Sequence, residues 1–168
     1  MTGEKQDEAL VLRRATTDDA PAIRSLTRAA YAKWVPLIDR EPLPMLADYV
    51  EAVQKHRIDL LYLAGQLAAL IEMIPQTGHL LVENVAVSPA FQRRGLGGKL
   101  LAHAEDVAAS LGYGEIRLYT NERFVGNVQL YGKLGYRIDR EEEFRGSMRV
   151  HMSKRLASRN APICSTSP

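Results

Sequence analysis

The most informative stretch of this sequence is Gln92-Arg93-Arg94-Gly95-Leu96-Gly97-Gly98-Lys99, which follows a strand-like apolar segment ending at Val87. Its three glycines let the backbone approach an anion closely, and the long helical pattern that begins at Leu96 turns its free amides, with their partial positive charge, toward the same place. Two arginines and a lysine add formal positive charge there. The turn therefore predicts a site for a ligand with several phosphates.

Two nucleotide-binding motifs do not fit this turn. A Walker loop places Ser or Thr after Gly-Lys, whereas Leu100 follows Lys99, and it begins with Gly where Arg93 stands. A Rossmann fingerprint requires a third glycine at position 100 and a repeating parallel β-α-β architecture, which the hairpin patterns contradict. On the turn alone, a structural role for the glycines and a solvated surface for the arginines stay open.

The segments on either side of the turn complete a pattern. Glu83-Asn84-Val85-Ala86-Val87-Ser88-Pro89 precedes it, and Leu130-Tyr131-Gly132-Lys133-Leu134-Gly135-Tyr136 follows the long helix. With them, the region from Val85 to Tyr136 resembles the GNAT superfamily of N-acetyltransferases. In that family the acetyl-CoA-binding turn has the form Gln/Arg-x-x-Gly-x-Gly/Ala, and a Leu-Tyr-x-x-Leu-Gly-Phe/Tyr segment follows. The resemblance implies an acetyl-CoA-dependent acyltransferase.

The periodicity of the whole chain predicts one α/β domain, α+β in some schemes. Patterns follow in the order β-α-α-β-β-β-α-β-α-β-β, which indicates a single mixed, largely antiparallel sheet with helices on both faces. The resemblance adds a V-shaped splay in that sheet. We expect the domain to span residues 9–156, between flexible segments at 1–8 and 157–168. The expected elements are strands at 10–16, two within 59–74, 79–87, 115–119, 136–143 and 147–156, and helices over 21–34, 45–53, 96–111 and 125–134.

Composition and charge restrict the class of protein. The 168 residues suit one domain, and 22 Lys+Arg against 20 Asp+Glu leave a formal net charge of +2, which gives no overall field to attract nucleic acid. The most apolar run, Leu60 to Ile74, is interrupted by polar residues and falls short of the roughly 20 residues that a membrane span requires. The single cysteine, Cys164, and an N-terminus without the features of a secretory signal favour a reducing cytoplasm.

The resemblance assigns the cosubstrate, acetyl-CoA, to specific residues. In this family the backbone of the central strand pairs with the pantetheine arm, here at Val85, Ala86 and Val87, and the turn holds the pyrophosphate through its amides. The turn residues expected to bind acetyl-CoA are Gln92, Arg93, Arg94, Gly95, Leu96, Gly97, Gly98 and Lys99. Many members have Asn seven residues before the motif tyrosine, where this chain has Phe124. Asn127 is the alternative contact, or else a polar residue of the helix surface.

Proton transfer requires an acid and a base, and the sequence offers candidates for both. The position that matches the family's general acid is Tyr131, whose hydroxyl would protonate the departing CoA thiolate. Without the motif, it would be an aromatic residue packed on a helix face. Deprotonation of an ammonium acceptor requires a base, and Glu83 on the central strand is the carboxylate best placed for it, with Glu72 second. Either glutamate is alternatively a charge turned to solvent, and attack by an already neutral amine requires neither.

The acceptor site is expected to involve the N-terminal helices, which in this family cover the far end of the cleft. Tyr31, Trp34, Arg40 and Met45 lie in that proline-interrupted region, and Glu72 completes the candidate set. An aromatic pair there can enclose an amine through a cation–π contact, although the single tryptophan can equally anchor the helix to the core. The four histidines form no ligand cluster in the sequence, so no metal is expected.

The sequence thus predicts an N-acetyltransferase that moves acetyl from acetyl-CoA to a primary amine of a small molecule, peptide or protein, by direct transfer through a tetrahedral intermediate. The alternative is a non-catalytic regulator or sensor that binds CoA or acyl-CoA with the same fold. No nucleic-acid or membrane partner is expected. Homodimers are common in this family, and the final hairpin offers an edge for one. The sequence does not identify the acceptor.

Overall fold

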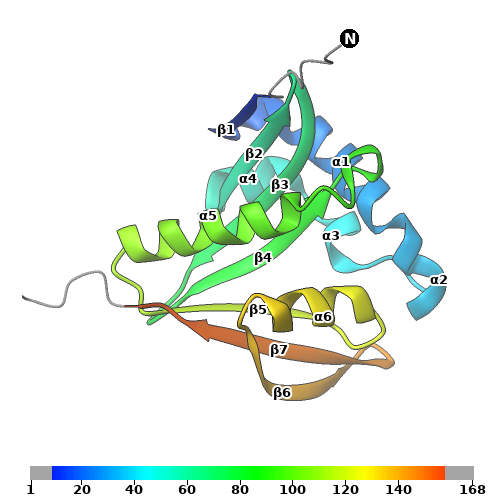
Figure 1. Ribbon diagram of the computed structural model, residues 1–168. Helices are drawn as coiled ribbons and strands as arrows, with labels where there is room; N and C mark the ends of the chain where they lie inside the picture. The colour runs from blue at the N-terminus through cyan, green and yellow to red at the C-terminus, as the bar shows by residue number, and fades with distance from the viewer. Residues whose placement is uncertain (1–8, 158–168) are drawn as a thin grey trace, which may run out of the picture.

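The computed structural model describes residues 9–157, and a single seven-stranded sheet runs through it (Figure 1). The strand order is β1-β2-β3-β4-β5-β7-β6, and every neighbouring pair is antiparallel except β4 and β5, which are parallel. The strands are β1 (Leu10–Arg14), β2 (Arg57–Leu63), β3 (Gln66–Pro75), β4 (Leu80–Val87), β5 (Glu115–Asn121), β6 (Arg137–Phe144) and β7 (Ser147–Arg155). The sheet confirms the expected mixed, largely antiparallel fold. The ends expected to be flexible, 1–8 and 157–168, lie outside the described residues except for Ala157.

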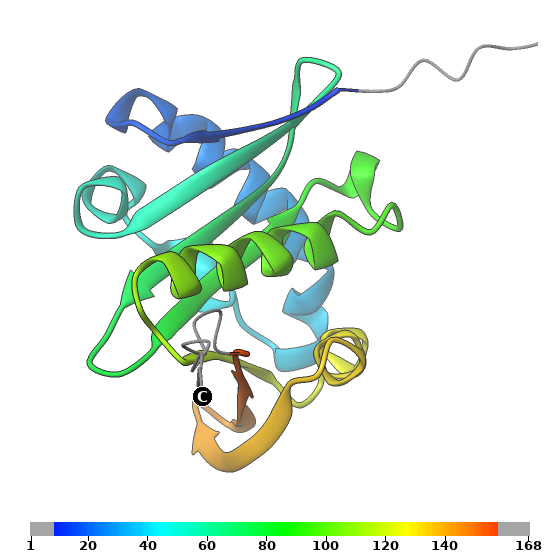
Figure 2. The ribbon, with the colours of Figure 1, turned by 60° about the vertical axis from the view of Figure 1, so that its left-hand side comes forward.

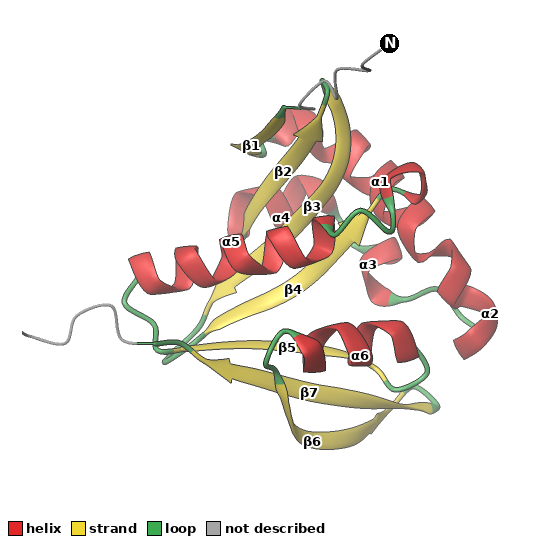
Figure 3. Cartoon of the chain, in the orientation of Figure 1, coloured by secondary structure: helices red, strands yellow, loops and turns green. Residues whose placement is uncertain are grey.

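Helices cover both faces of the sheet, as Figure 3 shows. The helices are α1 (Ala20–Tyr31), α2 (Val35–Ile38), α3 (Leu43–Leu46), α4 (Tyr49–Lys55), α5 (Leu96–Ser110) and α6 (Val125–Lys133), with short 3-10 helices η1 (Thr17–Asp19), η2 (Ala32–Trp34) and η3 (Pro89–Phe91). Where the sequence predicts one helix over 45–53, the chain forms α3 and α4 instead. The reason is Asp48, whose side chain accepts hydrogen bonds from the amides of Val50 (3.0 Å) and Glu51 (3.2 Å) and so begins a new helix.

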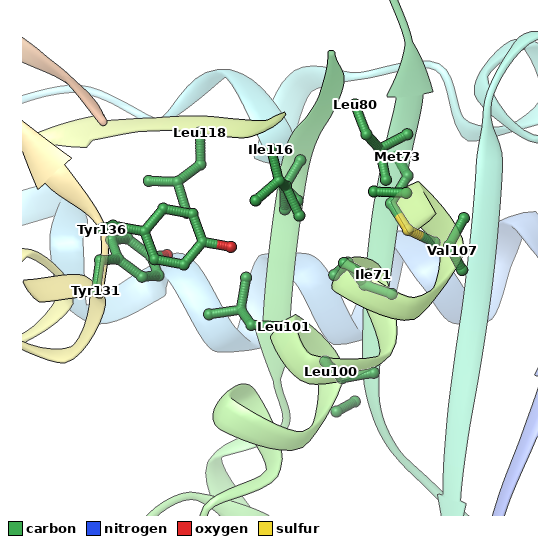
Figure 4. Packing of buried hydrophobic residues seen from close by; sticks show 14 of the residues in the cluster. Ile71, Met73, Leu80, Leu100, Leu101, Val107, Ile116, Leu118, Tyr131 and Tyr136 are labelled. Carbon is green, nitrogen blue, oxygen red and sulfur yellow. The ribbon is translucent and has the colours of Figure 1, made fainter. Parts of the chain in front are cut away.

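Two hydrophobic clusters lie on opposite faces of the sheet. On one face, α5 packs its buried stripe, which includes Leu100 and Val107, against β3 and β4 (Figure 4). On the other face, α1 and α4 pack through residues such as Ile23 and Tyr49. Figure 2 shows α5 in front of the strands and α1 behind them. The long helix predicted from Leu96 is thus confirmed, and one side of it is buried as its periodicity indicates.

The sheet opens into a V between β4 and β5. These two strands pair only where Leu80–Val82 meets Ile116–Leu118, although β4 continues to Val87 and β5 continues to Asn121. In Figure 1 the strands meet at one end and diverge toward α6. The splay expected from the family resemblance is therefore present.

A β-bulge in β4 marks the point where the V begins. In the pairing with β3, Asn84 lies opposite Glu72 and Val82 lies opposite Met73, so Glu83 is an extra residue in β4. A bulge bends its strand and increases the local twist. This bend carries the rest of β4 away from β5 and leaves room for a ligand between them.

Truncation of the buried stripe of α5 should destabilise the fold. Leu100 is fully buried between helix and sheet, so Leu100→Ala is expected to lower the free energy of unfolding by about 2–5 kcal/mol. Leu111, just after the same helix, is 51% exposed, so Leu111→Ala is expected to change it by less than about 0.5 kcal/mol. Urea denaturation of both variants measures the difference. Equal losses would contradict the assignment of the core.

Candidate active site

One pocket of the V, here called the turn pocket, has a volume of about 510 Å³. It lies between β4, the glycine-rich turn before α5, the segment from α1 to η2, and α6. Its lining residues are Ala30, Tyr31, Lys33, Trp34, Val85, Ala86, Val87, Phe91, Gln92, Arg93, Gly95, Leu96, Gly97, Gly98, Leu101, Asn127, Leu130 and Tyr131. The structure therefore brings together all the residues expected to bind acetyl-CoA except Arg94 and Lys99.

The turn between β4 and α5 presents backbone amides to this pocket. Gly95 caps the helix with a φ of 75°, in the left-handed region where glycine has no side-chain penalty. A Cβ built at Gly95 or Gly98 would meet no atom within 4 Å, so both glycines border open space. Helix-start amides that face open space fit a phosphate group. The residues present thus fit the pyrophosphate of acetyl-CoA.

The charged side chains of this region divide between the pocket and its outside. Arg93 lines the pocket, and so does Lys33, which the sequence did not single out. The guanidinium of Arg94 instead lies over the ring of Phe91, 5.4 Å from its centroid, and Lys99 is exposed on α5. Formal positive charge at the pocket wall therefore comes from the turn and from η2 together.

The strand β4 offers the V an unpaired backbone edge. Beyond Val82 this strand pairs with β3 alone, and Val85, Ala86 and Val87 line the turn pocket. The side-chain amide of Gln92 donates to the carbonyl oxygen of Val87 at 3.1 Å and holds the turn against the end of the strand. An extended ligand with amides of its own can pair with such an edge.

A second pocket of the V, here called the inner pocket, has a volume of about 90 Å³. It lies between β4, β5, α6, the β6–β7 hairpin and the segment from α2 to α3. Its lining residues are Tyr31, Ile38, Arg40, Pro42, Leu43, Pro44, Val82, Glu83, Asn84, Val85, Leu118, Tyr119, Thr120, Asn121, Phe124, Asn127, Tyr131, Phe144 and Arg149. Tyr31, Val85, Asn127 and Tyr131 line both pockets, so the pockets meet between β4 and α6.

Tyr131 is the residue of α6 that stands where the pockets meet. It is 9% exposed, and burial raises its pKa to about 12, so its hydroxyl stays protonated at neutral pH. Figure 4 shows its ring beside that of Tyr136, with 6.1 Å between the centroids. Within residues 9–157 no group hydrogen-bonds to the Tyr131 hydroxyl. It is therefore a protonated donor that is available to a ligand.

Glu83, the bulge residue, connects the two arms of the V. Its Oε1 accepts a 2.6 Å hydrogen bond from the hydroxyl of Tyr119 on β5, and both side chains line the inner pocket. Burial and the adjacent carboxylate raise the pKa of Tyr119, so the phenol keeps its proton and donates it to the hydrogen bond. This bond holds the carboxylate at the pocket wall while its second oxygen stays available.

Two aromatic residues of the expected acceptor site have different positions. Tyr31 lines both pockets, and its hydroxyl donates to Oδ1 of Asn84 at 2.8 Å. Trp34 lines only the turn pocket, and its ring stacks on Phe124 with 4.5 Å between the centroids. The stack joins η2 to the residue that precedes α6. Trp34 therefore joins two segments of the chain and also lines the turn pocket.

Met45 and Glu72 do not line either pocket. Met45 is 4% exposed, and its carbonyl oxygen accepts a hydrogen bond from Arg28 at 3.1 Å. Glu72 is buried on β3, where its Oε1 lies 2.6 Å from Nδ1 of His56 and burial raises its pKa. Both side chains are buried in the interior of the molecule. The acceptor site predicted from the sequence thus loses these two members.

Several residues of the inner pocket were not anticipated from the sequence, among them Tyr119, Phe144 and Arg149. They come from β5, β6 and β7, which make up the part of the sheet beyond β4, with β5 next to it. The sequence offered one signal for Arg149. Apolar and polar residues alternate along this strand, so Arg149 points to the face opposite to that of Val150, which is buried. Nothing in the local pattern indicated that the other side of β7 faces a pocket.

Three of the four histidines each lie against one carboxylate. His56 pairs with Glu72 at 2.6 Å, and two further pairs of 2.7 Å join His103 to Asp59 and His151 to Glu142. Residues 9–157 contain no group of three or more His, Cys, Asp or Glu side chains that could hold a metal ion. In the same range no helix is long and apolar enough to cross a bilayer.

Comparison with known proteins gives the family. Residues 21–136, more than half of the chain, match the acetyltransferase (GNAT) family. PaiA N-acetyltransferase from Thermoplasma acidophilum, solved in complex with coenzyme A, has a TM-score of 0.73 at 18% identity, over 88% of this chain and 99% of that one. Ribosomal-protein-S18-alanine N-acetyltransferase from Escherichia coli has a TM-score of 0.72 at 21% identity, over 90% and 98%. None of the curated proteins compared with the sequence matches it.

A further solved structure has the cosubstrate bound. It is a GNAT family acetyltransferase from Elizabethkingia anophelis with acetyl-CoA, with a TM-score of 0.67 at 19% identity, over 90% of this chain and 100% of that one. At these identities the likeness establishes the fold. The family match, the fold and the turn pocket agree with one another, and the chain belongs to the GNAT family of acetyltransferases.

Proposed function

We propose that this chain is an N-acetyltransferase that transfers acetyl from acetyl-CoA to a primary amine of a small molecule or peptide, directly and through a tetrahedral intermediate. The observation that carries the proposal is the meeting of the two pockets at Val85 and Tyr131. A thioester that arrives from one pocket and an amine that arrives from the other would be brought together there, and such positioning lowers the barrier. A regulator that only binds CoA needs the turn pocket alone.

The turn pocket would bind acetyl-CoA through backbone more than through side chains. The amides of Gly95 to Gly98 would hold the pyrophosphate, with Arg93 beside it. The unpaired edge of β4 would pair with the amides of the pantetheine arm. The backbone amide of Val85 or Val87 would then polarise the thioester carbonyl as charge develops on its oxygen.

The proposed chemistry assigns one proton transfer to each side of the thioester. Glu83 accepts a proton from the ammonium acceptor, the freed amine nitrogen forms a bond to the carbonyl carbon, and the carbon–sulfur bond breaks while this nitrogen loses its second proton to solvent. The hydroxyl of Tyr131 gives its proton to the departing thiolate. Tyr119 is a positioning residue, because its hydrogen bond holds the Glu83 carboxylate at the pocket.

The direct test is release of free CoA thiol from acetyl-CoA in the presence of a panel of amines that includes amino acids, polyamines and lysine peptides. The expected result is thiol release that depends on the amine, with the acetylated product seen by mass spectrometry. CoA binding is measured in parallel by calorimetry. Protein that binds CoA and releases no thiol with any amine would favour the regulator.

Removal of the Tyr131 hydroxyl should slow turnover without weakening CoA binding. Tyr131→Phe is expected to lower kcat about 10²-fold or more, because the thiolate then leaves without a proton donor. Because the pKa of this phenol is about 12, its acid form persists in alkali, so wild-type kcat should show no alkaline fall from this group up to about pH 10. Steady-state kinetics and calorimetry measure both quantities.

Tyr136→Phe is the matched control. This tyrosine is also buried, and its ring centroid lies 6.1 Å from that of Tyr131, but it lines neither pocket. Its variant should keep wild-type kcat and CoA affinity. An unchanged kcat in the Tyr131 variant, or equal losses in both, would remove the acid assignment.

Glu83→Gln should show its defect mainly at low pH. At neutral pH most of an alkyl amine is protonated, so loss of the base is expected to lower kcat/KM by about 10²-fold or more. The defect should shrink as the pH approaches the pKa of the amine, because the acceptor then arrives neutral. Glu141→Gln, on the exposed side of β6, is the control and should follow wild type at every pH. A defect of constant size across pH would argue against a base.

A further inference from the structure

Three arginines surround one phenylalanine at the wall of the inner pocket. The guanidinium carbons of Arg149, Arg145 and Arg40 lie 3.7, 5.5 and 5.7 Å from the ring centroid of Phe144. Arg40 comes from the segment after α2, and the other residues come from the β6–β7 hairpin. Arg40, Phe144 and Arg149 line the pocket itself. Segments far apart in the sequence thus bring like charges together at one place.

Carboxylates do not balance this positive charge. In the part of the chain that the structure describes, no carboxylate oxygen lies within 4.0 Å of a side-chain nitrogen of Arg40 or Arg145. Arg149 has Glu142 at 4.0 Å, but the same Glu142 oxygen already lies 2.7 Å from Nε2 of His151. Other arginines of the chain, such as Arg13 with Asp19 at 2.7 Å, have closer partners.

Arg149 and Arg40 are also partly withdrawn from water. The side chain of Arg149 is 20% exposed, and Arg40 donates from Nε to the carbonyl oxygen of Arg145 at 3.4 Å. Burial, together with the charges of Arg145 and Arg149, lowers the pKa of Arg40. Like charges held together in partial burial are unfavourable until an anion binds between them.

The wall of the same pocket also carries a carboxylate, separated from Arg149 by the side chain of Tyr119. The guanidinium of Arg149 lies over the ring of Tyr119, 4.4 Å from its centroid, and the hydroxyl of that tyrosine holds Glu83 at 2.6 Å. A pocket lined by a carboxylate and by separate guanidinium groups complements a ligand with both charges. Its volume of about 90 Å³ corresponds to about three waters at liquid density, which suits a small molecule.

From this charge arrangement we propose that the acceptor is a small amine that also carries a compact anionic group, a carboxylate or a phosphonate, bound by Arg40 and Arg149. The inference rests on the proposed function, since it names the substrate class of the same site. The anion lies against the two guanidinium groups, which bind pairs of oxygens of a carboxylate or a phosphonate through paired hydrogen bonds. The amine then lies toward Glu83 and Tyr131. A polyamine would place its second cation against the arginines.

The first experiment compares acceptors with the same carbon chain. An aminocarboxylate, the matching aminophosphonate and the matching aminoamide are tested at several chain lengths for thiol release from acetyl-CoA. The same compounds are tested by calorimetry for binding to protein loaded with CoA, in which no transfer takes place. At least one anionic compound is expected to exceed its amide by tenfold or more in kcat/KM and in affinity. The carboxylate and phosphonate arms show which anion fits better.

The second experiment removes the guanidinium groups. Arg149→Gln and Arg40→Gln are each expected to raise KM for the anionic acceptor tenfold or more, and to change KM for the amide less than threefold. Arg149→Lys should retain part of the preference, because it keeps the charge. Arg137→Gln is the control, since this exposed arginine of β6 pairs with Asp139 at 3.2 Å and lies outside both pockets. Circular dichroism and CoA affinity confirm that each variant folds.

The outcomes separate this inference from the proposed function. Thiol release that is equal with anionic and amide acceptors, or that Arg149→Gln lowers equally for both, overturns the inference and leaves the acetyltransferase standing. Anionic amines that bind the CoA-loaded protein without any thiol release uphold the anion site and overturn the proposed function. Neither binding nor release with any compound of the series overturns the inference, and the wider amine panel then decides the proposed function.

Discussion

The early end of the pairing between β4 and β5 is the constraint on which the site depends. The bulge at Glu83 adds one residue to β4, and therefore reverses which side chains face which layer. Before the bulge, Val82 belongs to the cluster under α5, and after it Ala86 belongs to the cluster with α1. Glu83 therefore both opens the sheet and switches the side chains of β4 that follow it to the opposite layers. It leaves backbone groups of β4 without a strand partner, which favours a ligand that can satisfy them, since an unpaired buried group costs about 1–3 kcal/mol.

The turn and the long helix could be predicted because their signals are local. Gly95 takes a positive φ, and the buried positions of α5 recur with the helical period, so a short window of sequence contains the information. The splay could not be predicted from a local signal, because it depends on the number of residues over which β4 and β5 pair. No periodicity records that number. Only the likeness to a family, carried by the strand, the turn and the Leu130–Tyr136 segment, supplied it from the sequence.

The polar side chains of the site could be predicted only in part. The hydrophobic stripe over 45–53 gave no sign that Asp48 would cap a separate helix, because a cap competes with periodicity at a single position. Glu72 and Glu83 are both carboxylates on strands of apolar residues, but their partners differ. Glu72 is buried against His56, whereas Tyr119 holds Glu83 at the pocket. Those partners lie 16 and 36 residues away along the chain, and their positions follow from the sheet order.

Tyr119 explains how opposite charges can line one small pocket without neutralising each other. Its hydroxyl, at the edge of the ring, donates to Glu83, while its face carries the guanidinium of Arg149. Direct contact between that carboxylate and that guanidinium would stabilise the charged form of the carboxylate and make it a poorer proton acceptor. The phenol keeps the two groups apart and still binds each of them. It therefore leaves a carboxylate and a cation available to one ligand, within a chain whose overall charge of +2 shows neither.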